Sequence, residues 1–243
     1  MDNYKNTAQA WHGKNLDVKI LFSVAGLATQ IWIENEQGSL LIDTGDGTLR
    51  DIVANKLDYK KIKGLLYTHG HFDHMGGLHT ILSFLRMIGR TEPLPIIAPA
   101  GCTEVFSTID NFIRCYPDST AYEILCRKGN SDDCFELSGM AIKPYPVVHC
   151  GSIMDGRILD QIPAFGYRIS CRDEHIAISG DTGDCPALRE LVQDADLAII
   201  EASYKDSANI SKDILKKVHL SEDLAIEIGK TAKEYILVHK IRR

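Results

Sequence analysis

The chain has 243 residues, of which 44% are hydrophobic and 25% are charged, and its net charge is −6. These proportions are ordinary for a soluble globular protein. One domain over residues 1–243 is the expected organisation, although two small domains would also fit this length. The acidic balance excludes a protein that is basic over its whole surface, so a contact with nucleic acid would need a local patch.

The cellular compartment of the protein is predicted from its lack of a membrane span, a signal peptide and a C-x-x-C cysteine pair. No apolar run approaches the length of a membrane span, and residues 1–15 have no apolar core of a signal peptide. The seven cysteines include no C-x-x-C pair, which favours reduced, buried side chains over a disulfide framework. We therefore expect a cytoplasmic protein with no membrane partner.

Residues 18–115 predict several strands and then an alternation of helices and strands. Short runs of apolar, β-branched residues bounded by Gly, Asn or Asp predict the strands. Apolar residues at helical spacing predict the helices. In chain order we expect strands at 18–26, 29–35 and 39–45, a helix at 48–57, a strand at 62–69, a helix at 78–88, a short strand within 91–101 and a helix at 102–115.

Residues 116–140 are polar and predict irregular structure, after which strands and helices alternate again. Strands are expected at 141–149, 164–171, 174–181, 196–203 and 235–240, and helices at 186–193 and 221–233. Ser221 is the expected N-cap of the last helix, because two acidic residues follow it. This order of elements favours a layered α/β (α+β) domain with helices outside two packed sheets.

Four of the apolar strands end in a side chain of a metal-binding type. Rigid scaffolds place functional side chains at strand ends and in the loops that follow. A single histidine at such a place is more often an ordinary surface or core residue, so the pattern gains its meaning from repetition. The four residues are His69, His149, Asp181 and His239.

The densest group of such side chains follows His69, because residues 69–74 read HGHFDH and add His71, Asp73 and His74. Packing does not explain this segment, since burying these side chains without partners would be costly. One zinc ion takes about four ligands. The segment and the three other strand-end residues together offer seven, which suit two metal ions about 4 Å apart that share one ligand.

The segment THGHFDHMGG (68–77) resembles the T-H-x-H-x-D-H signature of the metallo-β-lactamase fold. Other segments are similar to ribonuclease Z, a branch of that fold that removes 3′ trailers from precursor tRNA. The resemblance implies a four-layer αββα sandwich with two metals at one edge of the sheets. The similar segments cover most of residues 38–243: LIDTGDGTLRDI (41–52), GLHTILSFLRMIGRTEPLPIIAPAG (77–101), IPAFGYRIS (162–170), ISGDTGDCPALREL (178–191), ADLAIIEASY (195–204) and HLSEDLAIEIGKTA (219–232).

The resemblance also implies the metal ligands. The expected ions are two Zn²⁺, for which Mn²⁺ or Fe²⁺ could substitute. Asp43 would orient a ligand by a hydrogen bond on the side away from the metal, as partners of metal-binding histidines commonly do. One ion would be held by His69, His71 and His149 and the other by Asp73, His74 and His239, with Asp181 bridging them.

The reaction implied by the resemblance is the hydrolysis of a phosphodiester in a precursor tRNA or a smaller molecule. A zinc-bound hydroxide would attack phosphorus. His219, oriented by Glu201, would protonate the leaving oxygen. The expected catalytic residues are therefore Asp73, as a metal ligand, together with Glu201 and His219. The resemblance further implies a homodimer.

The chain departs from ribonuclease Z in two places that concern the substrate. The family usually has His-Glu-Ala-Thr where this chain has IEAS, with Ile200 in place of the histidine. Members that process tRNA carry a long protruding arm between the residues equivalent to His149 and Asp181. Residues 150–180 must also provide two strands and are too short for such an arm.

Two other interpretations follow from these departures. One is a small-substrate hydrolase of the same fold, such as a cyclic-nucleotide or other phosphodiesterase, an arylsulfatase or a thioesterase. The other is a metal-containing RNA-binding or regulatory protein without turnover. The complete ligand set argues against the second, because proteins of that kind usually lack ligands.

Overall fold

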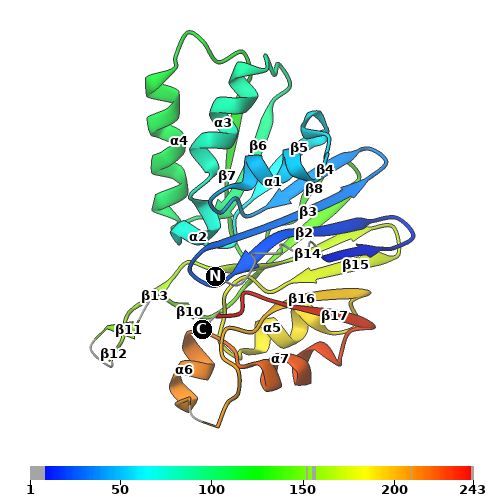
Figure 1. Ribbon diagram of the computed structural model, residues 1–243, viewed down its shortest axis with the longest axis vertical. Coiled ribbons are helices and arrows are strands. Elements are labelled where there is room, and N and C mark those ends of the chain that lie inside the picture. Colours follow the sequence, from blue (N-terminus) through cyan, green and yellow to red (C-terminus); the bar gives the residue numbers. More distant parts are fainter. Residues whose placement is uncertain (1–8, 152, 155–156, 209, 242–243) are drawn as a thin grey trace.

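The computed structural model describes residues 9–151, 153–154, 157–208 and 210–241. Two large sheets pack face to face, and helices cover the outer face of each (Figure 1). This is the four-layer αββα arrangement expected from the sequence. Residues 1–8, part of the segment without signal-peptide features, lie outside the described residues.

The first sheet contains seven strands in chain order. Tight turns join the first four strands as antiparallel neighbours, and longer connections through helices make the later pairs parallel. The strands are β1 (Gln9–His12), β2 (Asp17–Val24), β3 (Ala28–Asn35), β4 (Gly38–Ile42), β5 (Ile62–Leu66), β6 (Leu94–Pro99) and β7 (Ile124–Gly129). Their connections contain α1 (Thr48–Ala54), the 3₁₀ turn η1 (Tyr59–Lys61), α2 (Phe72–Met75), α3 (Leu78–Met87) and α4 (Thr103–Cys115).

The second sheet contains six strands and carries the C-terminal part of the chain. Its order is β17 (Glu234–Val238), β16 (Leu197–Glu201), β15 (Glu174–Ile178), β14 (Phe165–Cys171), β9 (Met140–Pro146) and β8 (Phe135–Leu137). Its helices are α5 (Pro186–Val192), α6 (Lys212–Lys217) and α7 (Glu222–Gly229). Two short pairs project from the body as a ribbon (Figure 1): β10 (His149–Cys150) with β13 (Gln161–Ile162), and β11 (Ile153–Met154) with β12 (Arg157–Ile158).

Side-chain alternation along the strands builds the layers. In β3, Ile31 and Ile33 pack in the core between the two sheets, while Trp32 points to the opposite face and packs with the helices over the first sheet. Each of these residues is at most 1% exposed. A strand that is buried on both faces reads as a continuous apolar run, which is why β3 and β16 were evident in the sequence.

Several local expectations were wrong or only partly right. The segment 116–140 is not wholly irregular, because it contains β7 and β8. β7 is an edge strand with exposed side chains from Cys126 to Lys128, so it lacks an apolar pattern. Ser221 is the N-cap residue of α7 as expected, yet its side chain makes no capping hydrogen bond. The cysteines are free, but Cys115, Cys126 and Cys134 are exposed rather than buried.

Within the described residues, no helix has the length and apolar character needed to cross a membrane. The cytoplasmic location stays a prediction.

Candidate metal centre

The candidate ligands come together where strands of both sheets end. Parallel neighbours such as β4 and β5, or β16 and β17, bring their carboxyl ends to the same edge of a sheet. Asp43 follows β4 and Glu201 ends β16. The predicted ligands His69, Asp181 and His239 follow β5, β15 and β17, His149 begins β10, and His71, Asp73 and His74 lie at or within α2.

The ligand atoms form overlapping groups, and the atoms of each group lie within 4.8 Å of one another. Asp181 connects the groups, because its Oδ1 is 3.3 Å from His74 Nε2 and its Oδ2 is 3.4 Å from His239 Nε2. The first two groups are those that the resemblance implied, and a third adds His219. They are His69, His71, His149 and Asp181; then Asp73, His74 and His239; then Asp181, His219 and His239.

Asp43 determines which ring nitrogen of two histidines faces the cluster. Its carboxylate accepts hydrogen bonds from His74 Nδ1 at 2.6 Å and from the Thr68 backbone N–H and hydroxyl, both at 2.8 Å. Because the Thr68 hydroxyl donates its proton to Asp43, it accepts from His69 Nδ1, 3.0 Å away. We therefore assign a proton to Nδ1 of both rings, and Nε2 is left to bind an ion.

Ser203 and a backbone carbonyl orient two more histidines in the same way. The Ser203 hydroxyl donates to Glu201 Oε2 at 2.9 Å, so it accepts from His239 Nδ1 at 3.0 Å. His149 Nδ1 donates to the Val218 carbonyl at 2.8 Å. His149 and His239 therefore also direct Nε2 into the cluster, as metal-binding histidines do when a partner fixes their tautomer.

This donor set fits divalent metal ions. His74 Nε2 lies 3.3 Å from His239 Nε2, and His149 Nε2 lies 3.3 Å from His71 Nδ1. Two nitrogens that present lone pairs to each other repel, and either a proton or a metal cation between them removes the repulsion. His69 Nε2 is buried and has no hydrogen-bond partner among the described residues. Imidazole with carboxylate is a ligand combination that suits zinc and related ions.

The protonation states of His69, His149 and Asp181 agree with this fit. Burial lowers the pKa of His69 well below its ordinary value and lowers the pKa of His149 to about 4. Burial alone would raise the pKa of Asp181, but the adjacent His239 and His74 rings hold it well below its usual range. Neutral imidazoles and an ionised carboxylate are the forms that a metal ion binds. His74 differs: burial lowers its pKa, but the Asp181 and Asp43 carboxylates outweigh this effect and raise it well above its ordinary value, so an ion that binds Nε2 must displace a proton.

His219 and Glu201 form a hydrogen-bonded pair beside the ligands. Glu201 is buried, and its Oε1 lies 2.9 Å from His219 Nδ1. Oε1 also accepts from the backbone N–H groups of Thr182 and Leu220. Burial disfavours the charged imidazole, but the Glu201 carboxylate outweighs this effect and raises the pKa of His219 to about 9. His219 Nε2 makes no hydrogen bond to any described residue.

Ile200, which replaces the histidine usual in the family, does not touch this pair. Successive strand residues point to opposite faces of a sheet. Glu201 therefore points to the ligand cluster, whereas Ile200 is fully buried among the side chains that pack α5 and α7 on the second sheet. The contacts of the Glu201 carboxylate with Thr182, Ser203, His219 and Leu220 do not involve this position.

A cavity of about 480 Å³ opens beside the cluster. Four of the ligands line it, together with Gly26, Phe72, Tyr204, His219 and Ile241. The turn at Gly26 contacts a candidate ligand, because the Gly26 backbone N–H donates to Asp73 Oδ2 at 2.8 Å. Gly26 has a φ of 69°, a backbone conformation that glycine adopts readily. A molecule in this cavity would therefore reach both the ligands and His219.

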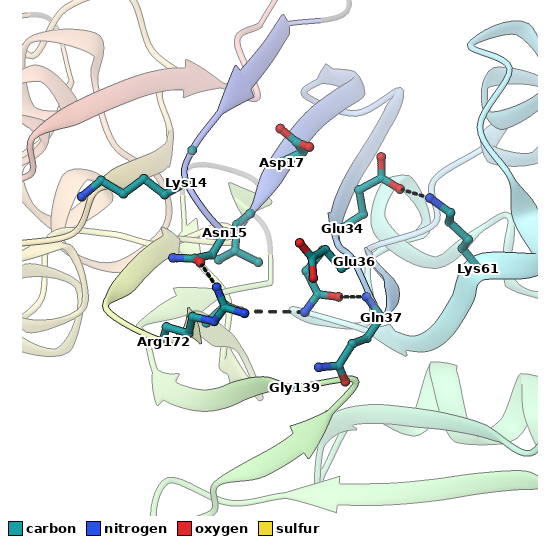
Figure 2. A pocket seen from close by; sticks show the side chains of 13 residues that line it. Lys14, Asn15, Asp17, Glu34, Glu36, Gln37, Lys61, Gly139 and Arg172 are labelled. Carbon is teal, nitrogen blue, oxygen red and sulfur yellow. Dashed lines mark hydrogen bonds and ion pairs between the residues drawn. The ribbon is translucent and has the colours of Figure 1, made fainter.

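A second cavity, of about 470 Å³, lies at the other end of the sandwich. Figure 2 shows the side chains that line it. β3 begins next to the turn at Gly26 and ends at Asn35 beside this cavity, and a strand of that length spans about 25 Å. Its lining mixes charges: Lys61 pairs with Glu34 at 3.6 Å, and Arg172 donates to Asn15 at 3.0 Å. Neither the ligands nor His219 lines it, so it is separate from the candidate metal centre.

Sequence reasoning did not identify three groups that the site uses. Thr68 was part of the recognised signature but had no assigned role, although it stands directly before His69. Ser203 lies two residues after Glu201, a spacing that places both side chains on the same face. The Val218 carbonyl carried no side-chain signal at all.

Comparisons with known proteins place the chain in a family. The model of the beta-lactamase superfamily domain matches residues 39–239. Ribonuclease Z of Agathobacter rectalis is 34% identical over 122 residues, which are 50% of this chain but only 39% of that relative. Ribonuclease Z of Clostridium tetani is 25% identical over 280 residues, covering 92% of this chain and 88% of the relative.

Solved structures show the same fold. The metallo-beta-lactamase fold protein YhfI from Bacillus subtilis has a TM-score of 0.75 at 17% identity and covers 95% of this chain and 88% of its own. The short form of human tRNase Z has a TM-score of 0.74 at 20% identity, with 93% of each chain covered. The predicted αββα fold, the resemblance to ribonuclease Z and the class of metal-dependent hydrolase are confirmed. The chain belongs to the beta-lactamase superfamily domain family.

Proposed function

We propose that this protein is a phosphodiesterase of the ribonuclease Z type that uses two Zn²⁺ ions. The observation that carries the proposal is the Glu201–His219 pair beside two groups of metal-binding side chains. A hydrolase that cleaves a P–O bond needs a stabilised nucleophile on one side of phosphorus and a proton for the leaving oxygen on the other. The ligand groups and His219 offer these functions in one cavity.

The proposed ligands are the seven that the sequence predicted. One ion would lie among His69, His71 and His149 and the other among Asp73, His74 and His239, with the Asp181 carboxylate reaching both. Such a pair of ions, when bound, supplies an activated water and neutralises charge on the phosphoryl oxygens. Asp43, Thr68 and Ser203 hold the imidazole rings in the tautomers that this arrangement needs.

His219 is the proposed donor of a proton to the leaving oxygen. Glu201 binds Nδ1 and fixes the ring, so Nε2 faces the cavity with its N–H available. Glu201 is itself fixed, because Ser203 and the backbone N–H groups of Thr182 and Leu220 donate to its carboxylate. A ring held in this way can donate without first reorganising, which is what general acid catalysis requires.

Two classes of phosphodiester are candidates for the substrate. The names of the curated relatives make the 3′ end of a precursor tRNA the first substrate to test. Among its described residues, the ribbon from β10 to β13 contains one arginine or lysine, Arg157, and one aspartate, Asp160. A projection that grips a phosphate backbone would be basic. This ribbon therefore favours the second candidate, a small phosphodiester, over RNA held by an arm.

The test uses the full-length, zinc-loaded protein with a precursor tRNA that has a 3′ trailer and, in parallel, with bis(p-nitrophenyl) phosphate. Cleavage of the tRNA at the trailer supports the ribonuclease function, and cleavage of the small ester alone supports the second candidate. If neither is cleaved by protein with a measured content of two metals per chain, the proposed function is wrong. The homodimer stays a prediction that sedimentation velocity would test.

A further inference from the structure

Phe72 is an exposed aromatic residue in the middle of the ligand segment. It stands between His71 and Asp73, and 66% of the residue is exposed. Its backbone is ordered as the first residue of α2, where its carbonyl accepts from the Gly76 N–H at 2.7 Å. The ring lines the cavity beside the ligands. It packs in none of the three cores, so its position needs another explanation.

Two other apolar residues lie on elements that are tied to Phe72. Gly26 donates to Asp73, the neighbour of Phe72, which holds the β2–β3 turn against α2. Ala25 in that turn lies close to Ile241, because Val24 pairs with Lys240 in a parallel bridge. Ile241 is 47% exposed and lines the same cavity, as does Ala25. We call Ala25, Phe72 and Ile241 the apolar rim.

The apolar rim and the proposed acid come from different parts of the fold. The rim is built from the β2–β3 turn, α2 and the segment after β17, whereas His219 comes from the segment between α6 and α7. The ester group that leaves must lie beside His219. The ester group that stays on phosphorus is then left to contact the rim at Phe72 on α2. Ile241 lies nearer the proposed acid, because its N–H donates to the Ser203 carbonyl next to Tyr204, whose ring is 6.2 Å from that of His219.

We propose that the apolar rim binds a planar aromatic group or nucleobase carried by the ester that stays on phosphorus. This inference rests on the proposed phosphodiesterase function and names the substrate class of the same site. An exposed aromatic ring offers its face to any planar ring, and stacking on such a side chain is tolerant of the base. No side chain of the rim is charged, so an alkyl ester of the same phosphate would gain less from it.

The experiment compares three esters with the same p-nitrophenolate leaving group in the zinc-loaded protein. Methyl p-nitrophenyl phosphate leaves the rim empty, phenyl p-nitrophenyl phosphate offers a small aromatic group, and thymidine 5′-(p-nitrophenyl phosphate) offers a nucleobase. The wild type should prefer at least one aromatic ester over the methyl ester in kcat/KM by about tenfold or more. The aromatic ester with the higher kcat/KM relative to the methyl ester identifies which of the two ring types the rim binds better.

Phe72→Ala and Phe72→Leu should lower this preference by about five- to tenfold, and Phe72→Trp should keep it. Phe72→Leu retains an apolar side chain and serves where the alanine variant loses metal or folds poorly. Ile113→Ala is the matched control, since Ile113 is 45% exposed on α4 and lies outside the cavity, and its preference should equal that of the wild type. An aromatic preference that is absent, or that survives Phe72→Leu, overturns the inference while the phosphodiesterase stands.

A binding measurement separates this inference from the proposed function. Calorimetry with phenyl phosphate and methyl phosphate needs no turnover. If the wild type hydrolyses none of the esters, the proposed function fails, and tighter binding of phenyl phosphate that depends on Phe72 still supports an aromatic site at the rim. If the wild type binds phenyl phosphate and methyl phosphate with equal affinity, the proposed aromatic site at the rim is wrong, whether or not the esters are hydrolysed.

Discussion

Glu201 Oε1 lies 2.9 Å from His219 Nδ1, and the same carboxylate reaches the ligand cluster through Ser203. Glu201 thus connects the proposed acid to a proposed metal ligand, because the Ser203 hydroxyl that donates to it accepts from His239. The carboxylate is buried and bound by four donor groups besides His219. Its orientation is therefore fixed by the fold before any substrate binds.

Replacing His219 by alanine should lower kcat in a way that depends on the leaving group. For an RNA or alkyl ester, whose leaving oxygen must be protonated, we expect a loss of about 10²–10⁴-fold. For bis(p-nitrophenyl) phosphate the loss should be much smaller, because p-nitrophenolate leaves without a proton. Steady-state kinetics on both substrates measures the difference. Equal losses on the two, with metal content unchanged, would show that His219 does not act as the acid.

Replacing Asp43 by asparagine should weaken metal binding. The amide has one accepting oxygen, so its NH₂ group would face either His74 Nδ1 and the Thr68 hydroxyl or the Thr68 backbone N–H, and it also lacks the negative charge; the hold on the two rings is weakened in either orientation. Loss of such a partner typically costs about 10–100-fold in metal affinity. Competition with a chromophoric zinc chelator measures this. Asp46→Asn, an exposed position nearby, is the control, and an affinity equal in both variants would contradict the role of Asp43.

Removing the metal should destabilise the folded protein. Without an ion, His69 Nε2 is buried with no hydrogen-bond partner among the described residues, and the facing nitrogens of His74 and His239 lose the cation that would separate them. An ion at 100 times its Kd stabilises the native state by about 2.7 kcal/mol. For a chain of this length that corresponds to a Tm difference of about 5–10 °C. Thermal unfolding with EDTA, and again after zinc is restored, tests this. An unchanged Tm would argue against metal in the cluster.

The fold was largely predictable because its central strands are buried on both faces. β3, β4, β5, β15 and β16 read as apolar runs, and each was predicted near its observed place. β7, α6 and the ribbon strands were not, for a physical reason: they are short or lie at an edge with exposed side chains, so no apolar period marks them.

The clustering of the candidate ligands could be predicted for a different reason. His69, His71, Asp73 and His74 are adjacent in sequence, and the others follow apolar strands whose ends a layered sheet brings together. The orienting groups were less visible, because they act through backbone atoms and single hydroxyls. Asp43 and His239 also adopt left-handed backbone angles, with φ of 56° and 55°, which no local pattern announces. Such conformations persist where the surrounding contacts over-determine them.

The α6 lysines Lys212, Lys216 and Lys217 offer a test of whether RNA is the substrate. They are exposed, and Lys217 lies just before Val218 and His219 at the cavity. If RNA is cleaved here, Lys216→Glu with Lys217→Glu should lower kcat/KM for precursor tRNA and reduce the salt slope of binding by about 1 per lysine. Hydrolysis of bis(p-nitrophenyl) phosphate, which has no polymer backbone, should change little. The matched control is Lys56→Glu with Lys60→Glu, which changes the net charge equally at exposed positions on another part of the surface. Equal effects of the two double variants on the tRNA would show that only the overall charge matters and that α6 is not the contact.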